Sequence, residues 1–192
     1  MQFAFYFGDH KDDGFRARLG YALIKAGQIK EHYGKYTHCE AIVGRVIESE
    51  KVVIASASVR DGNQVRLKAV KLNPSRWLIL DCPHYSLQQS LAWFIKNRRT
   101  PYSMLGAVAS TLWIARLLVS AFGIETTSLG QWCSRCISDS IGIQGGADFN
   151  VSELITLLVN MPDTKDITKE FFSGEVAIAE FPEEYSELLF AS

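Results

Sequence analysis

Hydrophobic and polar residues alternate along much of the first half of the chain. Three stretches carry this period of two, THCEAIVGRVI, KVVIASASV and NQVRLKAVKL, and short polar turns separate them. Because successive side chains of a strand point to opposite faces, the pattern predicts an antiparallel meander. In the third stretch Arg66 and Lys68 alternate with apolar residues, which predicts one solvent-exposed face. Two shorter strands are predicted, at FAFYF before the meander and at RWLILD after it.

The period changes to three or four residues in the second half, as in amphipathic helices. Helices are predicted at 86–97, 103–122, 133–141 and 152–159, and a basic helix is predicted near the start at 14–30. Gly123 and Gly142 are expected to end two of these helices, and Ser152 or Asn150 to cap the last. We therefore expect an α+β fold in which an antiparallel sheet packs against helices.

The composition is that of a globular protein, with 47% hydrophobic and 21% charged residues. A length of 192 residues suits one domain with a sizeable core better than two domains. We expect a single domain with its core at about 20–160 and a C-terminal appendage at 161–192, where the composition turns acidic. The 20 basic and 21 acidic residues give a net charge of −1, so no nucleic-acid partner is expected.

The first residues and the apolar stretch at 105–122 bear on location. The start lacks a basic segment followed by an apolar run, so no signal peptide is expected and the expected location is cytoplasmic. The stretch at 105–122 is nearly long enough to span a bilayer, and Arg116 is its only charge. Because a central arginine is costly in hydrocarbon, a buried or partner-facing helix is favoured over membrane contact.

The segment QWCSRCISDSIGI contains a candidate nucleophile. Cys133 begins a predicted helix directly after Gly-Gln-Trp. A thiol at a helix N-terminus lies at the positive end of the helix dipole, which favours the thiolate, and nearby backbone N–H groups can hold an oxyanion. Cys136 lies one turn further along the helix and is the second choice.

A thiolate nucleophile needs a base within hydrogen-bond reach. Of the four histidines, only His38 lies inside a convincing strand, and Glu40 follows two residues later. Residues two apart on a strand share a face, with Cβ atoms about 7 Å apart. Glu40 is therefore in a position to orient the His38 ring.

Two structural interpretations compete with a catalytic one. A cysteine at the start of an amphipathic helix is more often part of the core, and so is a single histidine in a strand. A tetrahedral zinc site is the other, and the available ligands are Cys133, Cys136, His38 and either Cys39 or Cys82. Paired zinc ligands usually lie in a loop or turn rather than inside a regular helix, so we expect neither a metal nor another cofactor.

Four motifs, in this order, resemble the permuted NlpC/P60 (YiiX/YebB-like) branch of papain-like cysteine hydrolases, which includes phage proteins. They are YTHCEAIVG as the histidine strand, ASASVRDGNQVRLKAV as the next hairpin, TPYSMLG as a connection and QWCSRCISDSIGI as the nucleophile helix. Together they cover roughly residues 20–158. The resemblance implies a permuted papain-like fold with the nucleophile cysteine at a helix N-terminus.

The resemblance also implies roles for particular residues. It makes Cys133 the nucleophile, with its backbone N–H in the oxyanion hole, and His38 the general base. Tyr102 matches a tyrosine that lines the site, and Trp132 is expected to line it as well.

The third polar residue of the site has two candidate positions. Many relatives place it on the strand after the histidine, where this chain has Ser56 and Ser58. Serine orients an imidazolium less well than a carboxylate does. We therefore favour Glu40 for this role and expect Ser56 to line the site.

The chemistry implied by the resemblance is acyl transfer through a thioester, as in an amidase or peptidase. Candidate substrates are a peptide, peptidoglycan or an acyl compound, and an acyltransferase is a variant of the same chemistry. Two other functions stay open: a papain-like binding or host-interaction protein without turnover, and a zinc-binding module. A phage-encoded member would act in the host cytoplasm.

Overall fold

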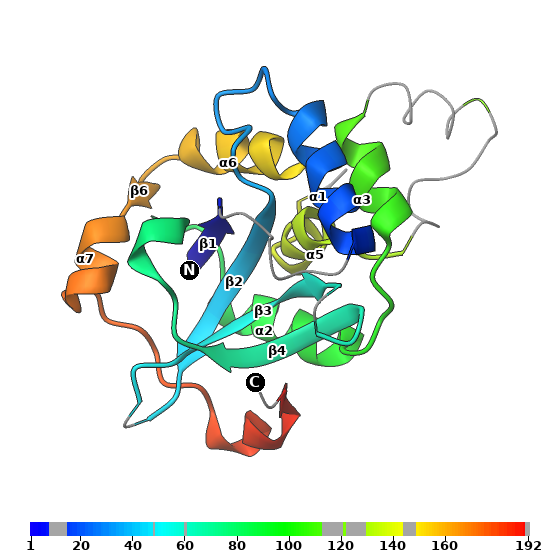
Figure 1. The fold of residues 1–192 in the computed structure, drawn as a ribbon. Coiled ribbons are helices and arrows are strands. Elements are labelled where there is room, and N and C mark those ends of the chain that lie inside the picture. Colours follow the sequence, from blue (N-terminus) through cyan, green and yellow to red (C-terminus); the bar gives the residue numbers. More distant parts are fainter. Residues whose placement is uncertain are drawn as a thin grey trace.

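A seven-stranded sheet forms the middle of the protein (Figure 1). The computed structural model describes residues 1–7, 15–47, 49–59, 61–112, 121, 130–143 and 149–190. The strands are β1 (Gln2–Tyr6), β2 (His38–Arg45), β3 (Val52–Ser58), β4 (Gln64–Val70), β5 (Trp77–Asp81), β6 (Lys165–Asp166) and β7 (Leu189–Phe190). Their order across the sheet is β6-β5-β1-β2-β3-β4-β7. The first six strands in this order pair antiparallel, and β7 pairs parallel with β4.

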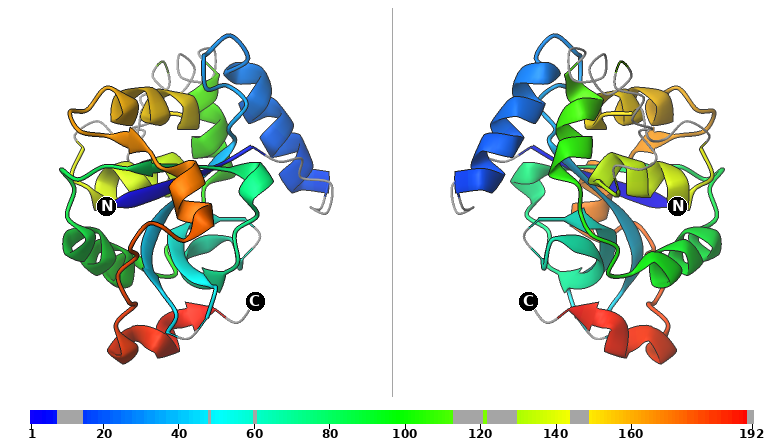
Figure 2. Two further views of the ribbon diagram at one scale, coloured as in Figure 1. Left: turned by 90° about the vertical axis from the view of Figure 1, so that its left-hand side faces the viewer. Right: turned by 90° about the vertical axis from the view of Figure 1, so that its right-hand side faces the viewer.

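Helices pack on both faces of this sheet, which confirms the predicted α+β class. The described helices are α1 (Phe15–Gly27), α2 (Leu87–Asn97), α3 (Met104–Thr111), α5 (Cys133–Ser140), α6 (Val151–Val159) and α7 (Thr168–Ser173), with 3-10 turns at Pro74–Arg76 and Glu183–Leu188. Helices α2, α5 and α6 share the larger hydrophobic core with one face of the sheet, and α7 covers part of the other face. Figure 2 shows α1 (blue) and the C-terminal segment (red) at opposite ends of the molecule.

The predicted meander β2-β3-β4 forms in the predicted order, and β2 is buried on both faces because it lies near the centre of the sheet. Cys39, Ala41 and Val43 belong to the core shared with the helices. Ile42 belongs to the smaller core on the opposite face. The alternation along this strand therefore separates two buried environments, rather than a buried face from a wet one.

The predicted solvent-exposed face of β4 is wrong at Arg66. Arg66 is only 2% exposed, whereas Lys68 on the same face keeps 21% of its side chain exposed. Two carboxylates accept hydrogen bonds from the Arg66 guanidinium, and these contacts compensate its removal from water.

Segments on both sides of the predicted core at about 20–160 take part in the sheet. Strand β1 precedes this core, yet it lies between β5 and β2 in the middle of the sheet. The C-terminal appendage at 161–192 adds β6 to one edge of the sheet and β7 to the other, which satisfies backbone groups that an edge strand leaves unpaired. Phe181 of this segment is buried against Gly44, where an added Cβ would lie 2.8 Å from the Phe181 Cα. Glycine is therefore required at this close approach.

Four of the five predicted helices form at the predicted places, and the fifth is shorter than predicted. Helix α2 begins after Ser86, whose side chain accepts from the Gln89 N–H, and Asn150 caps α6 in a capping box with Glu153. Gly142 follows α5 with φ +76°, a conformation that favours glycine. The helix predicted at 103–122 instead ends at Thr111, because the backbone is extended at residue 112.

Residues 113–120, with Arg116, and residues 122–129, with Gly123, lie outside the described part of the chain. Within the described residues, none of the helices combines the length and the apolar character needed to cross a bilayer.

Candidate active site

Helix α5 begins at Cys133, as the sequence predicts, and the residues before it are firmly placed. Gly130 adopts φ +83°, and its carbonyl accepts a 2.7 Å hydrogen bond from Arg135 Nη1. The Ser103 N–H donates to the carbonyl of Gln131 at 2.6 Å. Trp132 is the helix cap residue in an extended conformation, so the chain turns into the helix at Cys133 itself.

The Trp132 side chain fixes this entry into the helix by packing. Its ring is 1% exposed and lies against Gly106 of α3, where an added Cβ would come within 2.4 Å of two ring carbons. The Arg135 guanidinium lies over the ring at 5.3 Å from its centroid. Among the described residues the buried Trp132 Nε1 has no hydrogen-bond partner.

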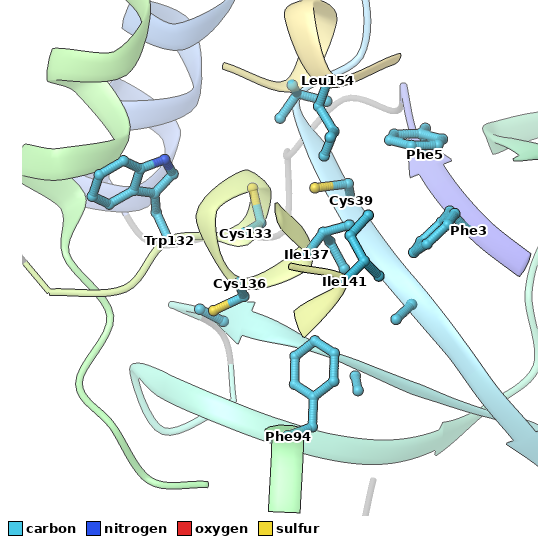
Figure 3. Packing of buried hydrophobic residues seen from close by; sticks show 14 of the residues in the cluster. Phe3, Phe5, Cys39, Phe94, Trp132, Cys133, Cys136, Ile137, Ile141 and Leu154 are labelled. Carbon is cyan, nitrogen blue, oxygen red and sulfur yellow. The ribbon is translucent and has the colours of Figure 1, made fainter. Parts of the chain in front are cut away.

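Cys133 lies between α5 and the start of β2. Figure 3 shows its sulfur facing that of Cys39. The interaction with the Cys39 thiol and then the positive charge of His38 lower the pKa of Cys133 well below its usual value, although burial acts in the opposite direction. The structure therefore brings the predicted nucleophile and the predicted base together.

Cys136 is placed differently from Cys133 although it is only one turn along the same helix. It is fully buried, and its thiol donates to Gln131 Oε1 at 3.3 Å. Burial raises the pKa of Cys136 well above its usual value, and the nearby Cys133 adds to this effect. Of the two sulfurs in this motif, only Cys133 has the electrostatic surroundings of a nucleophile.

His38 is the first residue of β2, and Glu40 lies beside it as the period of the strand predicts. The two side chains meet with 2.7 Å between His38 Nε2 and Glu40 Oε1. Burial alone would lower the pKa of His38, but the charges of Glu40 and Cys133 and hydrogen bonds with both raise it to about 9. His38 is therefore an imidazolium at neutral pH and stands between a thiolate and a carboxylate.

Glu40 is held by a residue that the sequence pattern did not indicate. Arg66 of β4 donates to both Glu40 oxygens at 2.7 Å, in the bidentate arrangement typical of a strong guanidinium–carboxylate pair. Burial would raise the pKa of Glu40, but Arg66 and then His38 lower it to about 2. The signal in the sequence was Glu40 itself, since a carboxylate in an otherwise apolar strand requires a buried cation.

Two further charges continue this row of side chains. Arg66 Nε donates to Asp61 Oδ2 at 3.0 Å, and Lys68 Nζ donates to Asp61 Oδ1 at 2.8 Å. The result is an alternating chain of cations and anions that runs from His38 to Lys68 along one face of the sheet. Such a row holds the Glu40 carboxylate in one orientation, because both of its oxygens are occupied.

The remaining predicted lining residues lie close by but outside this row. Ser56 is buried directly opposite Arg66 in the β3–β4 register, and its hydroxyl donates to the Ala57 carbonyl at 3.5 Å. Tyr102 is buried in the core, and its backbone forms a bridge with Gln131, two residues before the nucleophile. The geometry thus favours Glu40 over Ser56 as the partner of His38.

A cavity of about 360 Å³ opens beside this row. Its lining includes His38, Glu40 and Arg66, together with residues of β3, β4 and the turn before β5. Cys133 is 3% exposed and does not appear in the described lining, so His38 is the residue shared by the cavity and the thiolate.

The described candidates for a zinc site, Cys133, Cys136, His38, Cys39 and Cys82, do not form a set of metal ligands. Within the described ranges there is no group of three or more His, Cys, Asp and Glu residues with the arrangement of a metal site.

No family model matches the chain, and neither curated proteins nor solved structures gave a match.

Proposed function

We propose that this protein is a cysteine hydrolase of the amidase or peptidase type, with a permuted papain-like fold. The observation that carries the proposal is the arrangement of Cys133, His38 and Glu40: His38 Nε2 lies 2.7 Å from Glu40 Oε1, and the charges of His38 and Cys133 shift the pKa of each other. Supporting it, the histidine strand precedes the nucleophile helix in the chain, and α5 packs against the sheet next to β2.

The two pKa shifts determine the protonation states in which the site operates. At neutral pH the pair is a Cys133 thiolate and a His38 imidazolium, since the pKa of the thiol is lowered and that of the ring is raised to about 9. The thiolate attacks the carbonyl carbon of the substrate, and the carbonyl π electrons move to the oxygen. Backbone N–H groups of the first turn of α5, which lack partners within the helix, stabilise that oxyanion.

The imidazolium then completes acylation. As the C–N bond breaks, His38 donates its proton to the leaving amine, and a Cys133 thioester remains. Acylation removes the negative charge of Cys133, which is one cause of the raised pKa of His38, so this pKa falls. His38, left neutral by the proton transfer, now acts as the base: it takes a proton from water as the water oxygen attacks the thioester, and the C–S bond breaks to release the acid and the Cys133 thiolate. A second acceptor in place of water would make the reaction an acyl transfer.

Glu40 has a positioning role in this scheme. It accepts the second ring hydrogen bond of His38, which fixes the ring orientation and stabilises the imidazolium. Arg66 occupies the remaining acceptor capacity of the carboxylate, so Glu40 stays ionised and does not take the proton from His38.

Trapping of the acyl-enzyme tests the proposal. Wild type, Cys133→Ala and Cys136→Ala are mixed with p-nitrophenyl acetate, quenched within the burst and analysed by peptide mass spectrometry. We expect one acetyl group on the peptide with Cys133, retained in Cys136→Ala and lost in Cys133→Ala. Acetylation of Cys136 in the wild type would mean that the wrong sulfur is assigned.

One observation favours a second candidate, a papain-like binding protein without turnover. Cys133 is only 3% exposed, so a substrate carbonyl reaches it only if its surroundings move. Absence of an acyl-enzyme from the wild type, together with equal iodoacetamide labelling of Cys133 and Cys136, would favour this candidate. Peptide, peptidoglycan and acyl compounds remain the proposed ligand classes for either function.

A further inference from the structure

The lining of the cavity beside His38 contains more positive than negative side chains. The ion pairs of the catalytic row do not neutralise this excess. The described charged residues of the lining are four cations, Arg66, Lys68, Lys71 and Arg76, two carboxylates, Glu40 and Asp61, and His38. The balance without His38 is +2, and the imidazolium makes it +3. This local excess stands out because the whole chain has a net charge of −1. A concave, partly desolvated site of one sign attracts groups of the opposite sign.

The cations differ in how strongly the protein holds them. Arg66 is buried and bonded to two carboxylates, and Lys68 is bonded to Asp61 with 21% of its side chain exposed. Lys71 pairs only with Glu50 in the described part of the chain, and both side chains are more than 70% exposed. An exposed pair of this kind contributes little free energy, so Lys71 can turn to a ligand at small cost.

The rest of the cavity wall is apolar. Ile54 and Leu72 are buried, and Val70 and Trp77 are half-buried. These residues come from the face of the sheet away from α5 and belong to or pack on the smaller core. The volume of about 360 Å³ lies within the range of small-molecule sites, about 300–1,000 Å³. One wall therefore suits a short hydrocarbon chain, and the charged rim suits an anion.

We propose that this cavity binds an amphiphilic anion, with a carboxylate or phosphate group at Lys71 and Lys68 and an apolar part against Leu72 and Trp77. The inference rests on the proposed function: because His38 both lines the cavity and acts with Cys133, the bound anion would be part of the substrate. It narrows the substrate class to acyl compounds or peptides that carry a negatively charged group.

Binding is tested in the Cys133→Ala protein, which has no nucleophile, by titration calorimetry with octanoate, octyl phosphate and 1-octanol. Octanoate should bind about tenfold more tightly than octanol, and the difference should shrink as salt is added. Octyl phosphate separates the two sources of charge: tighter binding than octanoate indicates a phosphate ligand, and weaker binding a carboxylate.

A matched pair of lysine variants locates the site. In the Cys133→Ala background, Lys71→Met should reduce the affinity for octanoate about tenfold and leave that for octanol unchanged. Lys96→Met is the control, because Lys96 is exposed on α2 and does not line the cavity. Equal affinities for octanoate and octanol, or an equal loss in Lys71→Met and Lys96→Met, would overturn the inference.

The two proposals fail separately. Charge-selective binding in Cys133→Ala, together with a wild type that forms no acyl-enzyme, would support the anion site and refute the hydrolase. An acyl-enzyme that forms without any preference for anionic ligands would refute only the anion site.

Discussion

Replacement of Arg66 by methionine should destabilise the protein far more than loss of an ordinary ion pair. The Arg66 side chain is 3% exposed and donates two 2.7 Å hydrogen bonds to Glu40, which is itself 2% exposed. Removing one partner of a buried pair leaves an uncompensated charge and costs about 3–5 kcal/mol. A domain of this size is typically stable by about 5–15 kcal/mol, so the variant should still fold at room temperature.

Urea unfolding at pH 7 measures this loss, and Arg45→Met is the matched control. Arg45 pairs with Glu180 at 3.9 Å with both side chains more than half exposed, so its loss should cost at most about 1 kcal/mol. The double variant Arg66→Met/Glu40→Gln should recover part of the lost stability, because it also removes the carboxylate charge that Arg66→Met leaves without a partner. If Arg66→Met were no less stable than Arg45→Met, the buried row would not be held together as we describe.

The pH dependence of the same variant gives an independent check. In the wild type Glu40 has a pKa of about 2, lowered from 4.5, so its contribution to stability is present above pH 4.5 and is lost as the pH falls towards 2. Arg66 is the largest of the favourable causes, and without it the pKa of Glu40 rises. Acid unfolding of Arg66→Met should therefore begin at a higher pH than that of Arg45→Met, and coincident acid transitions would refute the assignment.

Three further predictions concern the surroundings of the nucleophile. The pKa of His38 is raised from 6.5 to about 9, so the contribution of His38 to stability is present below pH 6.5 and is lost as the pH rises through 9. The midpoints of urea unfolding at pH 6 and pH 9.5 should therefore differ less in His38→Gln than in wild type. Cys39→Ala removes the thiol whose interaction lowers the pKa of Cys133 most, so the pH profile of Cys133 alkylation should move to higher pH. An unchanged profile would show that Cys39 does not lower the pKa of Cys133. Gly106→Ala places a methyl group 2.4 Å from the Trp132 ring, so it should cost about 1–3 kcal/mol in urea unfolding and slow the alkylation of Cys133; a variant with wild-type values for both would show that this packing does not position the nucleophile.

The parts of the site that follow from local sequence were predictable. His38 and Glu40 are two residues apart on one strand, so the period of the strand alone places them on one face. The start of α5 was predictable because the apolar period and Gly130-Gln131-Trp132 mark a helix boundary there. Both features depend on interactions within a few residues.

Arg66 and Cys39 were not predictable because their partners are distant in sequence. Arg66 lies 26 residues from Glu40, and the two meet only through the registers of the meander. When its partner is unknown, a buried charged residue at an alternate strand position shows the same sequence pattern as an exposed one. Cys39 likewise meets Cys133 only because α5 packs on its face of β2.

The C-terminal edge strands were missed for a different reason. Strands β6 and β7 have two residues each, and two residues show no periodicity. Their conformation follows from the unpaired edges of β5 and β4, which exist only after the sheet has formed.

The rate of iodoacetamide alkylation at Cys133 as a function of pH shows whether this cysteine is an activated thiolate paired with His38. Peptide mass spectrometry separates this cysteine from Cys136, which lies on the same helix and serves as the internal reference. We predict that Cys133 reacts at least about tenfold faster than Cys136 at pH 7, with a midpoint well below the ordinary thiol pKa of about 8.5. His38→Ala should move that midpoint upwards. A midpoint near the ordinary value in the wild type, or equal rates for the two cysteines, would show that Cys133 is not an activated thiolate.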